Sequence, residues 1–106
     1  MKRKKSINKI QKAMKYEPLL TAVISKNQII TKLNLCVGRY FNYVLVDNDN
    51  IKYIGYTASL YRRLLQHKPK EFDSVLIMEF ETEESARANE RSMIKAMKPK
   101  SNYQFC

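Results

Sequence analysis

The chain has few of the residues that build metal centres and disulfide frameworks, with two cysteines and one histidine among 106 residues. Cys36 and Cys106 lie far apart, and neither belongs to a Cys-x-x-Cys pair or has a histidine neighbour. This spacing predicts neither a zinc site nor a disulfide, and it favours free thiols in a reducing compartment.

Long apolar runs are also missing. The longest stretches, such as Leu19-Leu20 and residues 22–24, fall far short of the roughly 20 residues that a helix needs to cross a bilayer. No unbroken apolar segment or small-residue cleavage site follows the basic N-terminus, so we expect no signal peptide and a soluble, cytoplasmic protein. The abundance of Lys, Asn and Ile favours a phage or mobile element, and hence a bacterial cell or a phage-infected host.

Acidic residues are scarce relative to basic ones. Ten Asp and Glu stand against 20 Lys and Arg, which gives a net charge of +10. Residues 1–32 hold nine of the cations and one acid, so the remaining residues carry only +2. This surplus exceeds what solubility requires and predicts a polyanion as partner, held first by the N-terminal segment.

The N-terminal segment has a helical pattern. Ile7, Ile10 and Met14 recur at helical spacing while lysines occupy the other side, which predicts a basic amphipathic helix over residues 6–16. One or two further short helices are expected within residues 19–35. Residues 1–38 would therefore form a basic, partly helical extension.

Residues 39–106 predict a separate domain that starts with a β-hairpin. Aromatic and β-branched residues fill two segments, residues 39–46 and 51–56. The turn sequence Asp-Asn-Asp-Asn at residues 47–50 separates them.

Helical and strand patterns alternate in the rest of this domain. A helix is expected up to about residue 67, a third strand over residues 74–81, and a helix over residues 83–97 that Thr82 caps. The predicted fold is α+β, with a small three-stranded antiparallel sheet, flanking helices and the element order β-β-α-β-α.

The last of these helices places a carboxylate on its apolar stripe. Glu90 shares that stripe with Ala86, Met93, Ile94 and Met97. Burying an unpaired carboxylate costs several kcal/mol, so this residue needs a partner. An ion pair with a neighbouring arginine, a position at the margin of the stripe, and a bound metal are all open interpretations.

The preceding helix places Ser59, Arg63 and His67 at intervals of four residues, on one side. Such a row is commonly a solvated surface, but beside a phosphate Arg63 would form a bidentate contact and His67 would supply a hydrogen bond or a proton. Gly55 ends the second strand, where a missing Cβ lets a backbone or ligand approach.

Taken in order, these residues resemble the GIY-YIG nuclease superfamily over about residues 40–104. The second half of the signature is intact as Tyr53-Ile54-Gly55, whereas Phe41-Asn42-Tyr43 keeps only the tyrosine of the first half. The β-β-α-β-α order is also the core arrangement of that family. The further residues that carry the resemblance are Thr57, Leu60, Arg63, His67, Glu90, Ile94, Pro99 and Asn102.

The resemblance implies a metal-dependent endonuclease that hydrolyses phosphodiester bonds of DNA, with one Mg²⁺ or Mn²⁺ per active site. By position, it implies Tyr43 as general base or water-positioning group, Tyr53 as its partner, Arg63 on the scissile phosphate, Glu90 on the metal, His67 beside the phosphate or Tyr43, and Asn102 as a hydrogen-bonding support. One acid agrees with one ion rather than two.

The basic extension would supply most of the affinity for DNA. The expected DNA-binding residues are Lys2, Arg3, Lys4, Lys5, Lys9, Lys12, Lys15, Lys52 and Arg62. Site specificity would require a homodimer, a partner protein or an unusual use of the extension. Three alternatives remain open: a catalytically inactive binder on the same fold, a basic RNA-directed protein, and a membrane-active peptide.

Overall fold

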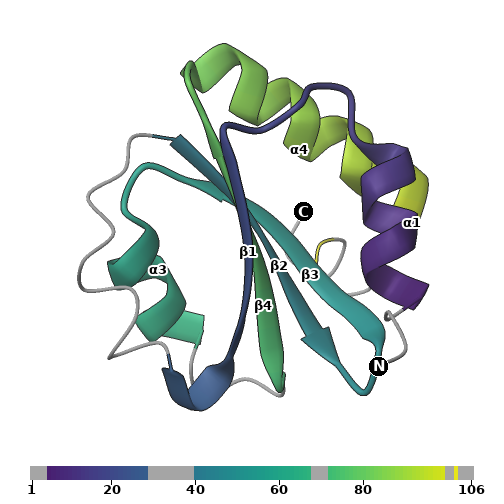
Figure 1. Ribbon diagram of the computed structural model, residues 1–106, viewed down its shortest axis with the longest axis vertical. Coiled ribbons are helices and arrows are strands. Elements are labelled where there is room, and N and C mark those ends of the chain that lie inside the picture. Colours follow the sequence, from purple (N-terminus) through teal and green to yellow (C-terminus); the bar gives the residue numbers. More distant parts are fainter. Residues whose placement is uncertain (1–4, 29–39, 68–71, 100–101, 103–106) are drawn as a thin grey trace.

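The computed structural model of the chain describes residues 5–28, 40–67, 72–99 and 102. Its elements are α1 (Lys5–Ala13), β1 (Leu20–Ser25), the 3-10 turn η1 (Lys26–Gln28), β2 (Tyr40–Asp47), β3 (Asn50–Thr57), α3 (Leu60–His67), β4 (Ser74–Phe80) and α4 (Glu83–Met97). The strands form one antiparallel sheet in the order β1-β4-β2-β3. In Figure 1, α3 lies on one side of this sheet, and α1 and α4 lie on the other. Within this described part, no helix combines the length and the apolar character that crossing a membrane requires.

The fourth strand corrects the sequence prediction. Residues 19–35 were expected to hold short helices, yet Leu20–Ser25 is a strand that pairs with β4 along its whole length. The α+β class is confirmed, but the sheet has four strands instead of three. Thr21, Val23 and Ile24 are β-branched, and pairing with β4 lets such residues pack on a pleated surface. Residues 29–35 of the expected helical segment lie outside the described residues.

The β2–β3 hairpin has the predicted turn. Asn48 and Asp49 have φ values of 49° and 62°, so both central residues adopt the left-handed conformation. Two-residue hairpin loops of the primed type need this conformation because its twist matches that of the strands. Asn and Asp tolerate it better than most residues, which explains why this sequence can turn without glycine.

The sheet separates two apolar clusters. On the α3 side, Phe41, Tyr43 and Leu45 of β2 pack with Leu60 and Leu64. On the other side, Val44 and Val46 belong to a second cluster, which takes Ile10 from α1 and Ala86 and Met93 from α4. The alternation along β2 follows the two-residue period of a strand. Since Ile10 is only 1% exposed, α1 packs into the core of the fold.

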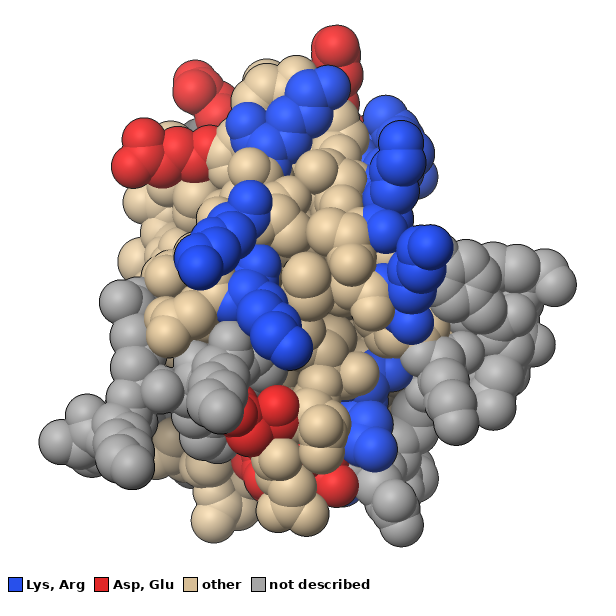
Figure 2. All heavy atoms as spheres, turned by 90° about the vertical axis from the view of Figure 1, so that its right-hand side faces the viewer, with Lys and Arg blue, Asp and Glu red and all other residues tan. Residues whose placement is uncertain are grey.

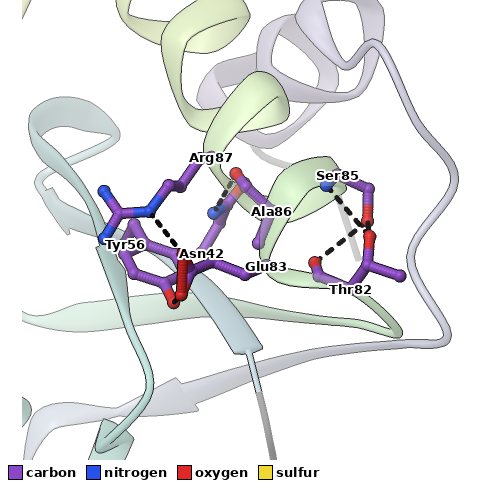
Figure 3. Close-up of polar contacts among 7 residues, drawn as sticks. All are labelled: Asn42, Tyr56, Thr82, Glu83, Ser85, Ala86 and Arg87. Atoms are coloured by element: carbon purple, nitrogen blue, oxygen red, sulfur yellow. Dashed lines mark hydrogen bonds and ion pairs between the residues drawn. The ribbon is translucent and has the colours of Figure 1, made fainter.

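Local hydrogen bonds fix both ends of α4. The Thr82 hydroxyl accepts a hydrogen bond from the backbone N–H of Ser85 at 3.1 Å, which confirms the predicted cap. Nearby, the Asn42 side chain donates to the carbonyl of Ala86 at 2.8 Å (Figure 3). At the other end Lys98 adopts a left-handed conformation and donates its N–H to the carbonyl of Ile94.

A buried amide pair joins the sheet, α4 and the segment after α1. The Asn89 amide donates to the Asn42 Oδ1 at 3.1 Å, and both residues are fully buried. The Asn89 Oδ1 accepts hydrogen bonds from the backbone N–H groups of Lys15 and Tyr16, at 2.7 and 3.0 Å. Ser92 adds a hydrogen bond from its Oγ to the carbonyl of Ala13 at 2.9 Å. These bonds hold α1 against α4.

We expect Asn89→Ala to lower the free energy of unfolding by about 3 kcal/mol, because it leaves several polar groups in the interior without partners. The matched control is Ser92→Ala, which removes a single hydrogen bond and should cost about 1 kcal/mol. Urea denaturation of both variants measures the difference. Equal and small losses would contradict the central place given to Asn89.

Candidate active site

Three aromatic rings meet on the α3 side of the sheet. The Tyr43 hydroxyl and the Nε2 of His67 are hydrogen-bonded at 2.9 Å, and both residues are buried. The Tyr53 ring centroid lies 5.9 Å from that of Tyr43 and 5.0 Å from that of His67. Strands β2 and β3 and the end of α3 thus bring together three of the residues that the sequence predicted for the site.

Gly55 makes room for this cluster. It stands opposite Tyr43 in the β2–β3 register. A Cβ at Gly55 would collide with the Tyr43 ring and its hydroxyl, so the ring lies directly over the glycine backbone. The position of the phenol therefore depends on the absence of a side chain at residue 55.

Gly55→Ala should lower the free energy of unfolding by about 2 kcal/mol, because the added methyl overpacks a filled site. In a Tyr43→Leu background, which lacks the colliding ring atoms, the same substitution should cost clearly less. Thermal unfolding of the two single variants and the double variant measures this coupling. Additive losses would show that the ring does not press on residue 55.

The surroundings of Tyr43 keep its proton in place. Burial raises the pKa of the Tyr43 phenol far above its usual range, and Tyr53 and Glu90 raise it further. Arg63 acts in the opposite direction and lowers that pKa. Two consequences follow: Tyr43 is a neutral phenol at neutral pH, and it lies within electrostatic reach of both Arg63 and Glu90.

Glu90 reaches the site from α4, at the outer edge of β3. Its side chain is half-buried, and the backbone N–H of Tyr56 lowers the pKa of its carboxyl. Burial raises the pKa of Glu90, while Arg87 and Arg91 lower it. The ion pair considered from the sequence is not present among the described residues, where the only salt bridge joins Arg87 and Glu83. Glu90 lies at the margin of the α4 stripe, and Asn89 takes the buried position.

Asn102 occupies the same edge of β3. Its side chain accepts a hydrogen bond from the Ile54 N–H at 2.8 Å and donates to the Ile54 carbonyl at 2.6 Å. Ile54 lies between Tyr53 and Gly55. Asn102 therefore supports the part of β3 that holds the Tyr53 ring and lies beneath the Tyr43 ring. An edge strand with exposed backbone groups would otherwise invite pairing with another chain.

A polar groove lies beside the N-terminal half of α3. Its volume is about 500 Å³, and its lining includes Arg62, Arg63, Gln66 and Arg87. The row of Ser59, Arg63 and His67 predicted from the sequence runs from solvent into the core, because Arg63 is exposed and His67 is buried. The arginine therefore faces the groove while the imidazole contacts Tyr43.

Arg87 is held at the wall of this groove. Its Nε pairs with a Glu83 carboxylate oxygen at 3.3 Å, and its guanidinium lies 4.3 Å from the centre of the Tyr56 ring (Figure 3). Both contacts are exposed, so they contribute little stability. They orient the guanidinium and leave its other N–H groups available for a ligand.

The other cations predicted to bind DNA are spread over the surface. Lys9, Lys12 and Lys15 are exposed on and just after α1, and Lys52 is half-buried on β3. Lys5 is the first residue of α1. The predicted contacts at Lys2, Arg3 and Lys4 lie outside the described residues.

One carboxylate, Glu90, is the group that a hard cation could use in this region. Within the described ranges there is no group of three or more His, Cys, Asp and Glu side chains that could hold a metal. Mg²⁺ does not need one, because it keeps several waters and is often held by one or two carboxylates together with substrate phosphates. Glu90, half-buried and outside any salt bridge of the described chain, is the residue here that matches this requirement.

Comparisons with protein-family models, with curated proteins and with solved structures found no match for this chain. The resemblance to GIY-YIG nucleases therefore stays a prediction that rests on the residues themselves.

Two residues of the site escaped the sequence prediction. Asn42 immediately precedes Tyr43 in β2, and Asn89 immediately precedes Glu90 in α4. The hydrogen bond between them fixes β2 at the residue before Tyr43 and α4 at the residue before Glu90. Periodicity carries a signal for Asn89, since it lies three residues after Ala86 and four before Met93, both buried.

Glu90→Gln should stabilise the protein near neutral pH. The pKa of Glu90 is raised in the folded state, so its charged form costs stability above that pKa, and glutamine removes this cost. Below the ordinary carboxyl value of 4.5, glutamate is neutral in both states and the difference should disappear. Urea denaturation at the two pH values measures it. A variant less stable than wild type near neutral pH would contradict the burial argument.

Proposed function

We propose that the protein is a metal-dependent DNA endonuclease with an active site of the GIY-YIG type. The observation that carries the proposal is that the Tyr43 hydroxyl is hydrogen-bonded to His67 beside the Tyr53 ring, at the end of the helix whose Arg63 lines a polar groove. A cation in a polar groove, a hydrogen-bonded phenol and a half-buried carboxylate are groups that phosphodiester hydrolysis can use. The clustering also agrees with the roles that the family resemblance implies.

The proposed proton path differs from a simple tyrosine base. Tyr43 holds its proton at neutral pH because burial raises its pKa, so it cannot begin as a phenolate. In the proposed step, water attacks phosphorus and gives a proton to the Tyr43 oxygen while Tyr43 passes its own proton to the Nε2 of His67. The bond from phosphorus to the leaving oxygen breaks, and that oxygen is protonated from solvent. The hydrogen bond of 2.9 Å supports this relay.

Arg63 is the proposed phosphate ligand. Its guanidinium lines the groove and offers a planar pair of N–H donors that matches two phosphate oxygens. Arg62 and Gln66 lie along the same groove and would contact neighbouring phosphates or sugars. Arg63 would also stabilise the charge that develops on the phosphate during attack.

Glu90 is the proposed ligand for one Mg²⁺ or Mn²⁺. Such an ion, when bound, neutralises phosphate charge and acidifies water. The half-buried carboxylate is available for this purpose because it lies outside the salt bridge of the described residues. Burial raises the pKa of this carboxyl, as is common for groups in binding sites.

The departure from the first signature triplet does not weaken the catalytic interpretation. Asn42 replaces the middle residue of that triplet, and its side chain is directed to Ala86 and Asn89 on the α4 side of the sheet. Tyr43 is directed to the opposite side. A substitution at residue 42 therefore changes the packing of α4 and leaves the groups around the Tyr43 hydroxyl intact.

Purified protein with Mg²⁺ should convert supercoiled plasmid into nicked or linear DNA. Glu90→Ala should abolish cleavage while DNA binding persists, and Tyr43→Phe should slow cleavage by about 100-fold or more because it breaks the proton path. Tyr61→Phe is the matched control, because it removes a tyrosine hydroxyl from α3 instead of from β2, and this variant should cleave normally.

Binding without cleavage by the wild type would support a catalytically inactive binder. Preferential binding of RNA would support an RNA-directed protein. Cleavage by Glu90→Ala would refute the metal assignment.

A further inference from the structure

We propose that the outer side of α4 binds the phosphate backbone of a DNA duplex. The residues of this surface, called the α4 track, are Arg87, Arg91, Lys95 and Lys98. The inference rests on the proposed nuclease function and adds a substrate-binding surface outside the groove. No cation of the track was among those predicted from the sequence to bind DNA.

After its acidic first turn, α4 exposes almost only positively charged side chains. From residue 86 to residue 98, every exposed residue is a cation except Ala96. The acids of the helix are elsewhere, in its first turn and at Glu90, which faces the edge of β3. Figure 2 shows Lys and Arg side chains gathered over α1 and α4 on this side of the molecule. A ligand that approaches here meets several Lys and Arg side chains on one face of the molecule.

The spacing of these charges is unfavourable for the helix alone. Arg87, Arg91 and Lys95 follow one another at intervals of four residues, where like charges repel and opposite charges are usual on solvated helices. The helix dipole favours cations in the last turn, which accounts for Lys95. It does not account for Arg91 in the middle of the helix. A polyanion bound along this side would relieve the repulsion.

The track continues the candidate site. Arg87 lines the groove together with Arg63, and it is also the first residue of the track. From residue 87 to residue 98 the helix rises about 16 Å. That length corresponds to about five base pairs of DNA. A duplex whose scissile phosphate contacts Arg63 would thus extend along α4.

The surface chemistry favours duplex DNA over other polyanionic partners. Single-stranded nucleic acids are usually held by exposed aromatic rings, and membranes by exposed apolar side chains. In the described part of the chain, the exposed large apolar side chains are Tyr16, Leu19, Leu20 and Val23, none of which is on α4. The α4 track offers charge alone, which suits the regular backbone of a duplex.

The test compares two proteins that both carry Glu90→Ala, so that binding is measured without cleavage. One of them also carries Arg91→Ala, Lys95→Ala and Lys98→Ala, which spares the groove residue Arg87. Affinity for a short DNA duplex is measured as a function of salt. We expect the salt slope to fall by about 2 to 3 and the affinity at 0.1 M salt to fall by about 100-fold.

Single substitutions supply a control of equal charge. Lys95→Ala should reduce the salt slope by about 0.9. Lys26→Ala removes the same charge from η1, where Lys26 lies over the Phe72 ring, and should leave the slope unchanged. Equal effects of the two substitutions would mean that only net charge matters, and they would overturn the α4 track.

Two further results would overturn the inference. The first is an unchanged salt slope in the triple variant. The second is tighter binding of single-stranded DNA or of anionic lipid vesicles than of duplex by the parent protein. Plasmid nicking by the wild type is measured separately. Failure of the α4 track therefore appears in DNA binding, and failure of the nuclease proposal appears in nicking.

Discussion

The hydrogen bond between the side chains of Asn42 and Asn89 is the contact on which the arrangement of this protein depends. It joins the central strand β2 to α4 inside an apolar cluster, and Asn89 also accepts two backbone N–H groups from the segment after α1. Buried amides are expensive unless every group is paired, so the network specifies one packing of these elements. Each asparagine directly precedes a site residue in the chain. The same hydrogen bond therefore also fixes the backbone positions of Tyr43 and Glu90.

The candidate site combines groups that would each be more stable elsewhere. Tyr43 lies under a ring cluster that requires a glycine opposite it, and Glu90 keeps a carboxylate in a half-buried place where its pKa is raised. Costs of this kind are typical of sites that act on a ligand. Asn102 supports β3 between the two site positions Tyr53 and Gly55, because it bonds both backbone groups of Ile54.

Much of the fold could be predicted from local signals. The hairpin turn at Asn48 and Asp49 and the cap at Thr82 depend on neighbouring residues, and the structure confirms both. Strand β1 could not be predicted in this way, because its residues become a strand only by pairing with β4, about 50 residues further along the chain. The buried place of Asn89 depends on donors at Lys15 and Tyr16, which the helical pattern of α4 does not reveal. For the site, the order of Tyr43, Tyr53, Arg63 and Glu90 along the chain was evident from the sequence alone. The sequence could not predict that Tyr43 stays protonated, because that depends on how deeply the fold buries its hydroxyl.

The central claim is that Glu90 and the ring cluster form one site for a divalent cation. The most direct test is a titration with Mn²⁺, followed by paramagnetic broadening of backbone amide signals. We predict selective broadening around Glu90 and around Tyr56, whose N–H lowers the pKa of the Glu90 carboxyl, and loss of this broadening in Glu90→Gln. Uniform broadening over the chain, or the same pattern in Glu90→Gln, would contradict the account.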